Sequence, residues 1–199
     1  MTSRLVVNSV RHTGASADAL TLDSGGGVTI PTKKLICPGT VVQVVQTVIS
    51  DVKSYTPSGA NTYTDMPGFT GTITPSSSSN KILITVGIGG IHQEYGTIAG
   101  KIQRGTTDIG VGDANGSRPR SGFRMYGSSI YNTNHCGSYH YTFLDSPATT
   151  NATTYKLVTM GEGGSGQPVY LNRSVQDSND AYSYRSTTIS TMTLMEIAA

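Results

Sequence analysis

Polar and apolar residues alternate most clearly over residues 81–90, which read Lys-Ile-Leu-Ile-Thr-Val-Gly-Ile-Gly-Gly. Successive side chains of a β-strand point to opposite faces of the sheet. The β-branched residues Ile82, Ile84, Val86 and Ile88 would therefore all lie on one face. We expect a strand here, with its even-numbered positions in a hydrophobic core.

The residues before this strand carry turn signals. Pro75 fixes its own φ and lacks a backbone donor, and the serines up to Asn80 can hydrogen-bond their own backbone. Residues 72–74, Thr-Ile-Thr, lead into this turn. We therefore expect residues 71–90 to form a β-hairpin or a short corner between paired strands.

The rest of the chain repeats this pattern of short β-rich segments separated by Gly, Ser, Asn or Pro. About eight strands at regular spacing, with no convincing helix, predict an all-β fold in which the main domain is a β-sandwich or jelly roll. In the segment 138–144, the aromatic residues Tyr139, Tyr141 and Phe143 would share one face. The remaining expected strands cover residues 41–50, 69–74, 98–104, 108–112, 123–126, 130–131, 154–160, 169–172 and 184–197.

The first 40 residues have a different organisation from the rest. Residues 19–23 and 28–31 flank a glycine turn and predict a small β-hairpin, which would be marginal in isolation. Pro38 and Gly39 break any strand that continues from it, so we expect an N-terminal arm at residues 1–40 and a β-sandwich domain at residues 41–199. The apolar residues of the arm are enough for docking but too few for a core. They are Leu5, Val6, Val7, Leu20, Leu22, Val28 and Ile30.

Composition narrows the range of partners. Charged residues make up 13% of the chain, against about 25% in ordinary domains. The formal net charge is +2. This balance argues against a nucleic-acid partner and suits a surface that associates. No apolar stretch is long enough to insert into a membrane. We interpret the two cysteines, Cys37 and Cys136, as small core or interface residues.

Motifs for chemistry are incomplete. Residues 161–166 match G-x-G-x-x-G, but a strand-like segment follows where a dinucleotide site needs a helix. His92 and Glu94 could share a strand face, but they lack a third metal ligand, and we interpret His92 as an exposed, salt-bridged histidine. Residues 113–116 and 177–180 resemble fragments of calcium loops without the required glutamate. We expect no enzyme activity, no cofactor and no metal site.

Three passages together resemble a known family. Residues 8–31, residues 44–47 with 72–86, and residues 190–198 are similar to tail-fibre-like virion structural proteins of marine tailed phages of the cyanophage and pelagiphage kind. The resemblance implies a homotrimeric protein of the phage particle surface, anchored to another virion protein by its N-terminal arm. Residues 112–137 carry no resemblance, so we expect a partner-specific surface there.

Two functions follow from this resemblance. The first is a short tail-fibre or spike protein that contacts the host surface, and the alternative is a capsid decoration protein that stabilises the phage head. The attachment-like arm favours the first, while the short chain without a repeat or heptad shaft favours the second. A sugar-cleaving spike would need paired acids, and none stands out.

Tyrosine and amide side chains suit wet, sugar-like surfaces such as a host-cell glycan. The expected contact residues are Tyr126, Tyr131, Asn132 and Tyr182, with packing between strands as the alternative for the tyrosines.

Overall fold

The structure is a computed structural model that describes residues 6–30, 37–59, 62–93, 96–126, 136–161, 167–176 and 180–199. Within these ranges the chain is all-β, apart from one short 3-10 turn, η1 (Ser183–Arg185). The strands are β1 (Ser9–Val10), β2 (Leu20–Leu22), β3 (Val28–Thr29), β4 (Val41–Ile49), β5 (Lys53–Tyr55), β6 (Thr64–Ile73), β7 (Lys81–Gln93), β8 (Thr97–Arg104), β9 (Thr107–Ile109), β10 (Phe123–Tyr126), β11 (Gly137–Asp145), β12 (Thr153–Gly161), β13 (Val169–Leu171) and β14 (Ser190–Ile197).

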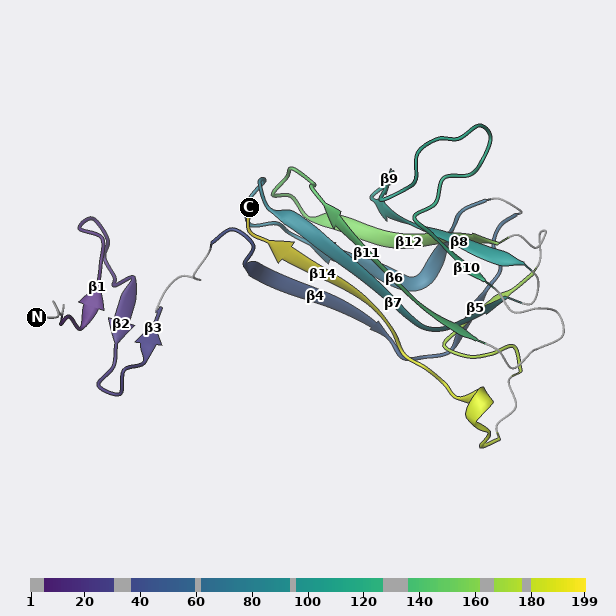
Figure 1. Ribbon diagram of the computed structural model, residues 1–199, viewed down its shortest axis with the longest axis horizontal. Helices are drawn as coiled ribbons and strands as arrows, with labels where there is room; N and C mark the ends of the chain where they lie inside the picture. The colour runs from purple at the N-terminus through teal and green to yellow at the C-terminus, as the bar shows by residue number, and fades with distance from the viewer. Residues whose placement is uncertain are drawn as a thin grey trace, which may run out of the picture.

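The first three strands form a small antiparallel sheet in the order β1-β2-β3, which lies apart from the larger domain in Figure 1. The predicted hairpin is confirmed as β2 and β3. Its turn is fixed by the Asp23 carboxylate, which accepts hydrogen bonds from the backbone N–H groups of Gly25 (2.9 Å) and Gly27 (2.7 Å). Gly26 has a φ of 85°, a conformation that glycine adopts at no steric cost.

The larger domain is a sandwich of two sheets (Figure 1). The first sheet has the order β4-β14-β7-β11, with β13 and β5 continuing it beside the far end of β7. The second sheet has the order β10-β8-β12-β6, with β9 also paired to β8. The eight principal strands, numbered 1 to 8 along the chain, are β4, β6, β7, β8, β10, β11, β12 and β14. In this numbering the first sheet has the order 1-8-3-6, and the second sheet, read from β6, has the order 2-7-4-5. This is the strand order of a jelly roll, and the predicted β-sandwich fold class is confirmed.

Of the two alternatives expected for residues 71–90, the hairpin is wrong and the short corner is what the chain forms, although it links strands of different sheets. Strand β6 pairs with β12 in the second sheet, whereas β7 pairs with β14, β11 and β13 in the first. The turn between them crosses from one sheet to the other. It folds around the buried carboxylate of Glu196, which accepts hydrogen bonds from Ser76 N (2.6 Å), Ser76 Oγ (2.7 Å) and Asn80 Nδ2 (2.6 Å).

A buried asparagine joins β13 and β14, which pair in succession along the same side of β7. Asn172 has a φ of 61° and donates from Nδ2 to the carbonyl oxygens of Ile49 (2.8 Å) and Asp51 (2.9 Å). Its Oδ1 accepts from Ser190 Oγ at 2.6 Å. This side chain replaces ladder hydrogen bonds where the sheet is interrupted.

Two further boundaries differ from prediction. The last strand begins at Ser190 and not at residue 184, because residues 183–185 form η1. The expected strands leave residues 51–68 without one, but this segment contains β5, which is held by pairing with β13. The expected strand at residues 130–131 lies outside the described residues.

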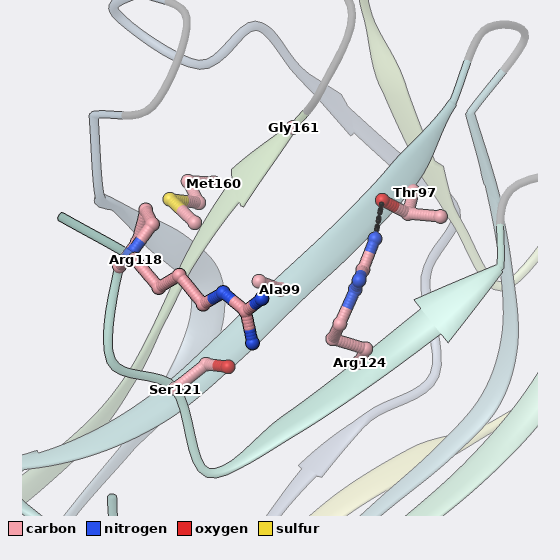
Figure 2. A pocket seen from close by; sticks show the side chains of 8 residues that line it. Thr97, Ala99, Arg118, Ser121, Arg124, Met160 and Gly161 are labelled. Carbon is pink, nitrogen blue, oxygen red and sulfur yellow. Dashed lines mark hydrogen bonds between the residues drawn. The ribbon is translucent and has the colours of Figure 1, made fainter. Parts of the chain in front are cut away.

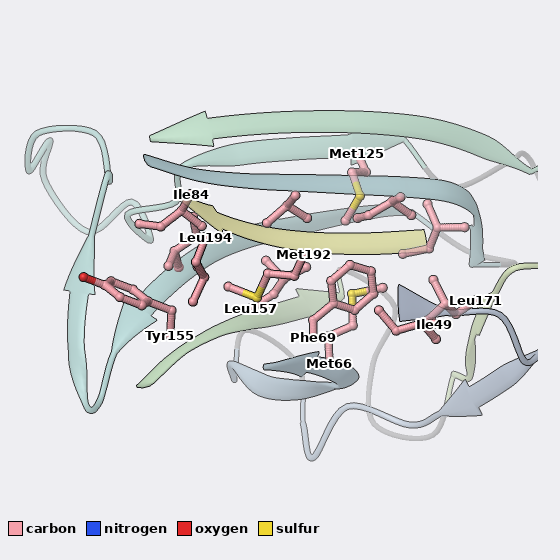
Figure 3. Packing of buried hydrophobic residues seen from close by; sticks show 14 of the residues in the cluster. Ile49, Met66, Phe69, Ile84, Met125, Tyr155, Leu157, Leu171, Met192 and Leu194 are labelled. Carbon is pink, nitrogen blue, oxygen red and sulfur yellow. The ribbon is translucent and has the colours of Figure 1, made fainter. Parts of the chain in front are cut away.

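The core lies between the two sheets (Figure 3). The predicted register of β7 is confirmed, because Ile82, Ile84, Val86 and Ile88 are all buried. Tyr139, Tyr141 and Phe143 of β11 share one face, as predicted, and that face packs against the same core. The largest fully buried side chains of the core include Phe69, Ile73, Ile98, Ile102, Met125, Tyr155, Leu157 and Leu171.

An ion pair ties the sheets together at one edge of this core. The Arg104 guanidinium of β8 donates to both carboxylate oxygens of Asp145 on β11, at 2.9 and 3.0 Å. The hydroxyl of Tyr155 on β12 donates to the same carboxylate at 2.7 Å. Burial and the neighbouring Asp145 raise the pKa of Tyr155, so this phenol stays protonated and remains a donor.

The two ends of the domain meet. Gly39 N donates to the carbonyl oxygen of Ala198 at 2.8 Å, and Ala198 N donates to that of Thr40 at 2.9 Å. The C-terminus therefore lies beside the start of β4, on the side from which the N-terminal sheet extends (Figure 1).

Candidate functional site

The outer face of the first sheet is apolar and almost free of charge. Its side chains line up in rows, because the strand registers pair Val44 with Met195, Met195 with Leu83, and Leu83 with Leu144. This is an unbroken apolar row across four strands. Val44 is 56% exposed and Leu144 is 46% exposed. We call this surface the neutral face, and it consists of the outward positions Val44, Gln46, Val48, Leu83, Thr85, Gly87, His140, Thr142, Leu144, Thr191, Thr193 and Met195. The exposed Lys81 lies at its margin, at the start of β7, where it pairs with Ile197.

The next rows of the neutral face are polar but uncharged. One row joins Gln46, Thr193, Thr85 and Thr142, and Gln46 Nε2 donates to Thr193 Oγ1 at 3.0 Å. Apart from His140, none of these positions is titratable. The exposed apolar row is the part of this face suited to contact with another protein surface.

The outer face of the second sheet has a different chemistry, and we call it the charged face. Lys156 Nζ lies 2.7 Å from Asp65 Oδ1, and Lys101 Nζ lies 2.6 Å from Asp108 Oδ2. Lys101 also lies over the ring of Tyr63, 3.7 Å from its centroid. Burial works against the charge on Asp108, but hydrogen bonds from Lys101 and Gln103 outweigh it and lower its pKa. These side chains largely satisfy one another.

Beside these ion pairs, the loop over residues 110–122 borders an open cavity of about 420 Å³ (Figure 2). Arg118 and Ser121 come from this loop, while Arg124 comes from β10 and Thr97 from β8. The described lining contains two arginines and no carboxylate.

The predicted contact residues fall in different places. Tyr182 precedes η1 and is 57% exposed, so it does not pack between strands. Tyr126 ends β10, where its backbone pairs with Thr97. Tyr131 and Asn132 lie outside the described residues.

The predicted anchoring residues lie on the small N-terminal sheet, except for Leu5, which is outside the described residues. The side chains of Val7, Leu22 and Val28 are exposed, while those of Leu20 and Ile30 are partly buried. Leu22 and Val28 are directly paired across β2 and β3. The sheet thus presents apolar side chains that its own strands do not cover.

The other motifs have these outcomes. His92 is buried, so the predicted exposed position is wrong. Its ring centroid lies 6.4 Å from that of Tyr170 on β13. The burial follows from the pairing of β13 with the end of β7. Cys37 is exposed, whereas Cys136 is half-buried and burial raises the pKa of its thiol. Glu94, residues 162–166 and residues 177–179 lie outside the described residues.

No group of three or more His, Cys, Asp or Glu side chains that could hold a metal ion occurs in the described parts of the chain. Nor do these parts contain a helix long and apolar enough to cross a membrane.

Sequence reasoning missed both the neutral face and the two cavity arginines. A signal for the neutral face was present, because the odd positions of residues 83–87 read Leu, Thr and Gly, without charge. No such signal joined Arg118 to Arg124, because their proximity depends on a loop conformation.

No model of a known protein family matches the chain, and no curated protein is significantly similar to it.

Proposed function

We propose that this chain is a non-enzymatic structural protein of a tailed-phage virion, a short tail-fibre or spike protein that works as a homotrimer. The neutral face is the observation that carries this proposal. An uncharged sheet face loses little hydration on contact with a neighbouring copy, and few like charges oppose that contact. A closed cyclic assembly would cover it in every copy.

The N-terminal sheet supports the second part of the proposal, attachment to another virion protein. Its exposed Val28 and Leu22 need a cover, since a sheet this small is marginal alone. The resemblance of residues 8–31 to the attachment segment of marine phage tail-fibre-like proteins agrees with this role. The larger domain would then point outward, and its loops would contact a glycan on the host cell.

The oligomeric state tests the assembly. Light scattering on the full chain at micromolar concentration should give three times the 20.9 kDa chain mass. The substitution Val44→Asp places a charge in the apolar row and should release monomers. Wild-type protein that is monomeric under these conditions contradicts the proposal.

Attachment is tested separately with particles that lack the protein. The full chain should be incorporated, while residues 41–199 alone should melt cooperatively but remain unbound. A matched variant, Leu22→Asp with Val28→Asp in the full chain, should behave like the fragment. Normal incorporation of either one would mean that the N-terminal sheet is not the anchor.

A second candidate is a capsid decoration protein that stabilises the phage head. The jelly roll follows the N-terminal sheet without an intervening shaft in the sequence, which suits a subunit that lies flat on a shell. Copy number separates the two functions, because a fibre is present as a few trimers at the tail and a decoration protein as many copies over the head.

A further inference from the structure

The exposed side chains of Arg118 and Arg124 border the open cavity on the charged face. Two guanidinium groups line it, and no described carboxylate forms an ion pair with either of them. Three other arginines form ion pairs, Arg104 with Asp145, Arg185 with Asp180 and Arg11 with Asp18, while the guanidinium groups of Arg120 and Arg173 donate to backbone carbonyl oxygens. Figure 2 shows the side chains of Arg118 and Arg124 approaching the same space above β8.

Both arginines are positioned by the fold. Arg124 pairs through its backbone with Ala99, and its Nη2 donates to Thr97 Oγ1 at 2.8 Å. The loop that carries Arg118 is closed by a hydrogen bond from Gly112 N to Ser121 O (3.1 Å). The guanidinium of Arg120 donates to Gly112 O at 2.6 Å, which fixes the same loop from inside.

The loop is also attached to the sandwich. Tyr63 Oη donates to the carbonyl oxygen of Arg120 at 2.8 Å, and Gly122 N donates to that of Gly100 at 2.9 Å. A site whose walls are held in this way loses little conformational entropy when it binds a ligand.

The lining determines the chemistry of the ligand. Planar guanidinium groups match oxyanions, to which they donate two parallel hydrogen bonds. The Ser121 hydroxyl is a further polar group, while Ala99 and Met160 add apolar surface. The volume of about 420 Å³ lies within the range of small-ligand sites, about 300–1,000 Å³, and exceeds what an inorganic ion needs. Among the described lining residues there is no aromatic ring for stacking on a neutral sugar.

We propose that this cavity binds a saccharide unit carrying an oxyanion, such as a uronate or a sulfated sugar of the host surface. The negative group lies between Arg118 and Arg124, and the ring lies against Met160 and Ala99. This inference rests on the proposed host-contacting function and specifies the acidic class of glycan.

Isothermal titration of the full-length protein tests the site with four probes: glucuronate, glucose 6-sulfate, glucose and sodium sulfate. Glucuronate or glucose 6-sulfate should bind, and affinity should fall as sodium chloride is raised. Glucose and sodium sulfate should bind at least tenfold more weakly. Equal affinity for glucose would overturn the role of charge, and equal affinity for sodium sulfate would overturn the role of the sugar ring.

The variants Arg118→Gln and Arg124→Gln should each weaken binding about tenfold or more, which corresponds to about 1.4 kcal/mol or more. Lys156→Gln is the matched control, because it removes one positive charge from the same face outside the cavity. Thermal melts establish that each variant is folded. Unchanged affinity in both arginine variants, or no binding of either acidic sugar by the wild type at millimolar concentration, contradicts the site. In those cases the trimer mass and particle incorporation still report on the proposed function independently.

Discussion

The two outer faces of the sandwich come from the same alternating strands, yet they have opposite surface chemistry. The charged face satisfies its side chains locally, through Lys156 with Asp65 and Lys101 with Asp108. The neutral face has no such pairs, and its row from Val44 to Leu144 crosses four strands without a charge. The charged face is therefore suited to water and small ligands, whereas the neutral face is suited to contact with another protein surface. One jelly-roll domain can thus offer one face for contact with another protein and the opposite face for binding a small ligand.

The largest expected loss of stability comes from a charge placed at a core position of β7, compared with the same charge at the preceding position, which lies on the neutral face. Val86→Asp would bury an unpaired charge and should destabilise the fold by several kcal/mol. Thr85→Asp, one residue earlier, should remain folded because its side chain is on the outer face. Denaturant unfolding of both variants measures the difference. Soluble Val86→Asp protein with wild-type stability would falsify the register.

A second comparison sets the ion pair between the sheets against one on the charged face. Arg104→Ala leaves the nearly buried Asp145 carboxylate with the Tyr155 hydroxyl as its remaining described side-chain donor, and should cost about 2 kcal/mol. Lys156→Ala breaks a pair whose Asp65 partner is 67% exposed, and should cost at most about 1 kcal/mol. Urea unfolding midpoints compare the two variants. Equal losses would mean that the sheets are not tied together at Arg104.

The third prediction concerns pH and the turn that crosses between the sheets. Burial alone would raise the pKa of Glu196, but hydrogen bonds from Asn80, Ser76 and Gln43 outweigh it and lower the pKa. The ionised group therefore stabilises the fold above its unfolded pKa of about 4.3, and this contribution is lost as the pH falls through the folded pKa. Melting temperature should decrease as the pH is lowered from 6 to 3.

Glu196→Gln tests this assignment. The variant should lose about 1 kcal/mol at pH 7 and show a smaller fall in melting temperature at low pH. Some dependence should remain, because the hydrogen bond from Lys53 lowers the pKa of Asp51. A variant that loses as much stability on acidification as the wild type would exclude Glu196 as a source of the pH dependence.

The last prediction compares one added charge on each outer face of the sandwich. The added charge should change folding stability little, but on the neutral face it should disrupt assembly. Thr142→Asp adds a charge to the neutral face, and Thr72→Asp adds the same charge to the outer surface of the second sheet. Both side chains are exposed, so each change should cost less than about 1 kcal/mol. Sedimentation should show that only Thr142→Asp dissociates the proposed trimer. Dissociation by both variants, or by neither, would remove the functional distinction between the faces.

Local patterns predicted the register of β7 and the β2–β3 hairpin, because alternation and a glycine turn act within a few residues. They failed between β6 and β7, where the turn chemistry of Pro75–Asn80 is used to cross between sheets. Its folding depends on Glu196, more than 100 residues away, and no local signal contains that contact. The same applies to Arg118 and Arg124, which border one cavity only because the loop between them is held to β8.

The contacts of Ala198 with Gly39 and Thr40 have a consequence for synthesis on the ribosome. Strand β14 pairs with both β4 and β7, so the first sheet lacks an inner strand until β14 has left the exit tunnel. Until then, the backbone edges of β4 and β7 that pair with β14 are open to other strands. The first sheet can therefore close only after β14 has emerged, which makes this strand the one that times folding of the sandwich.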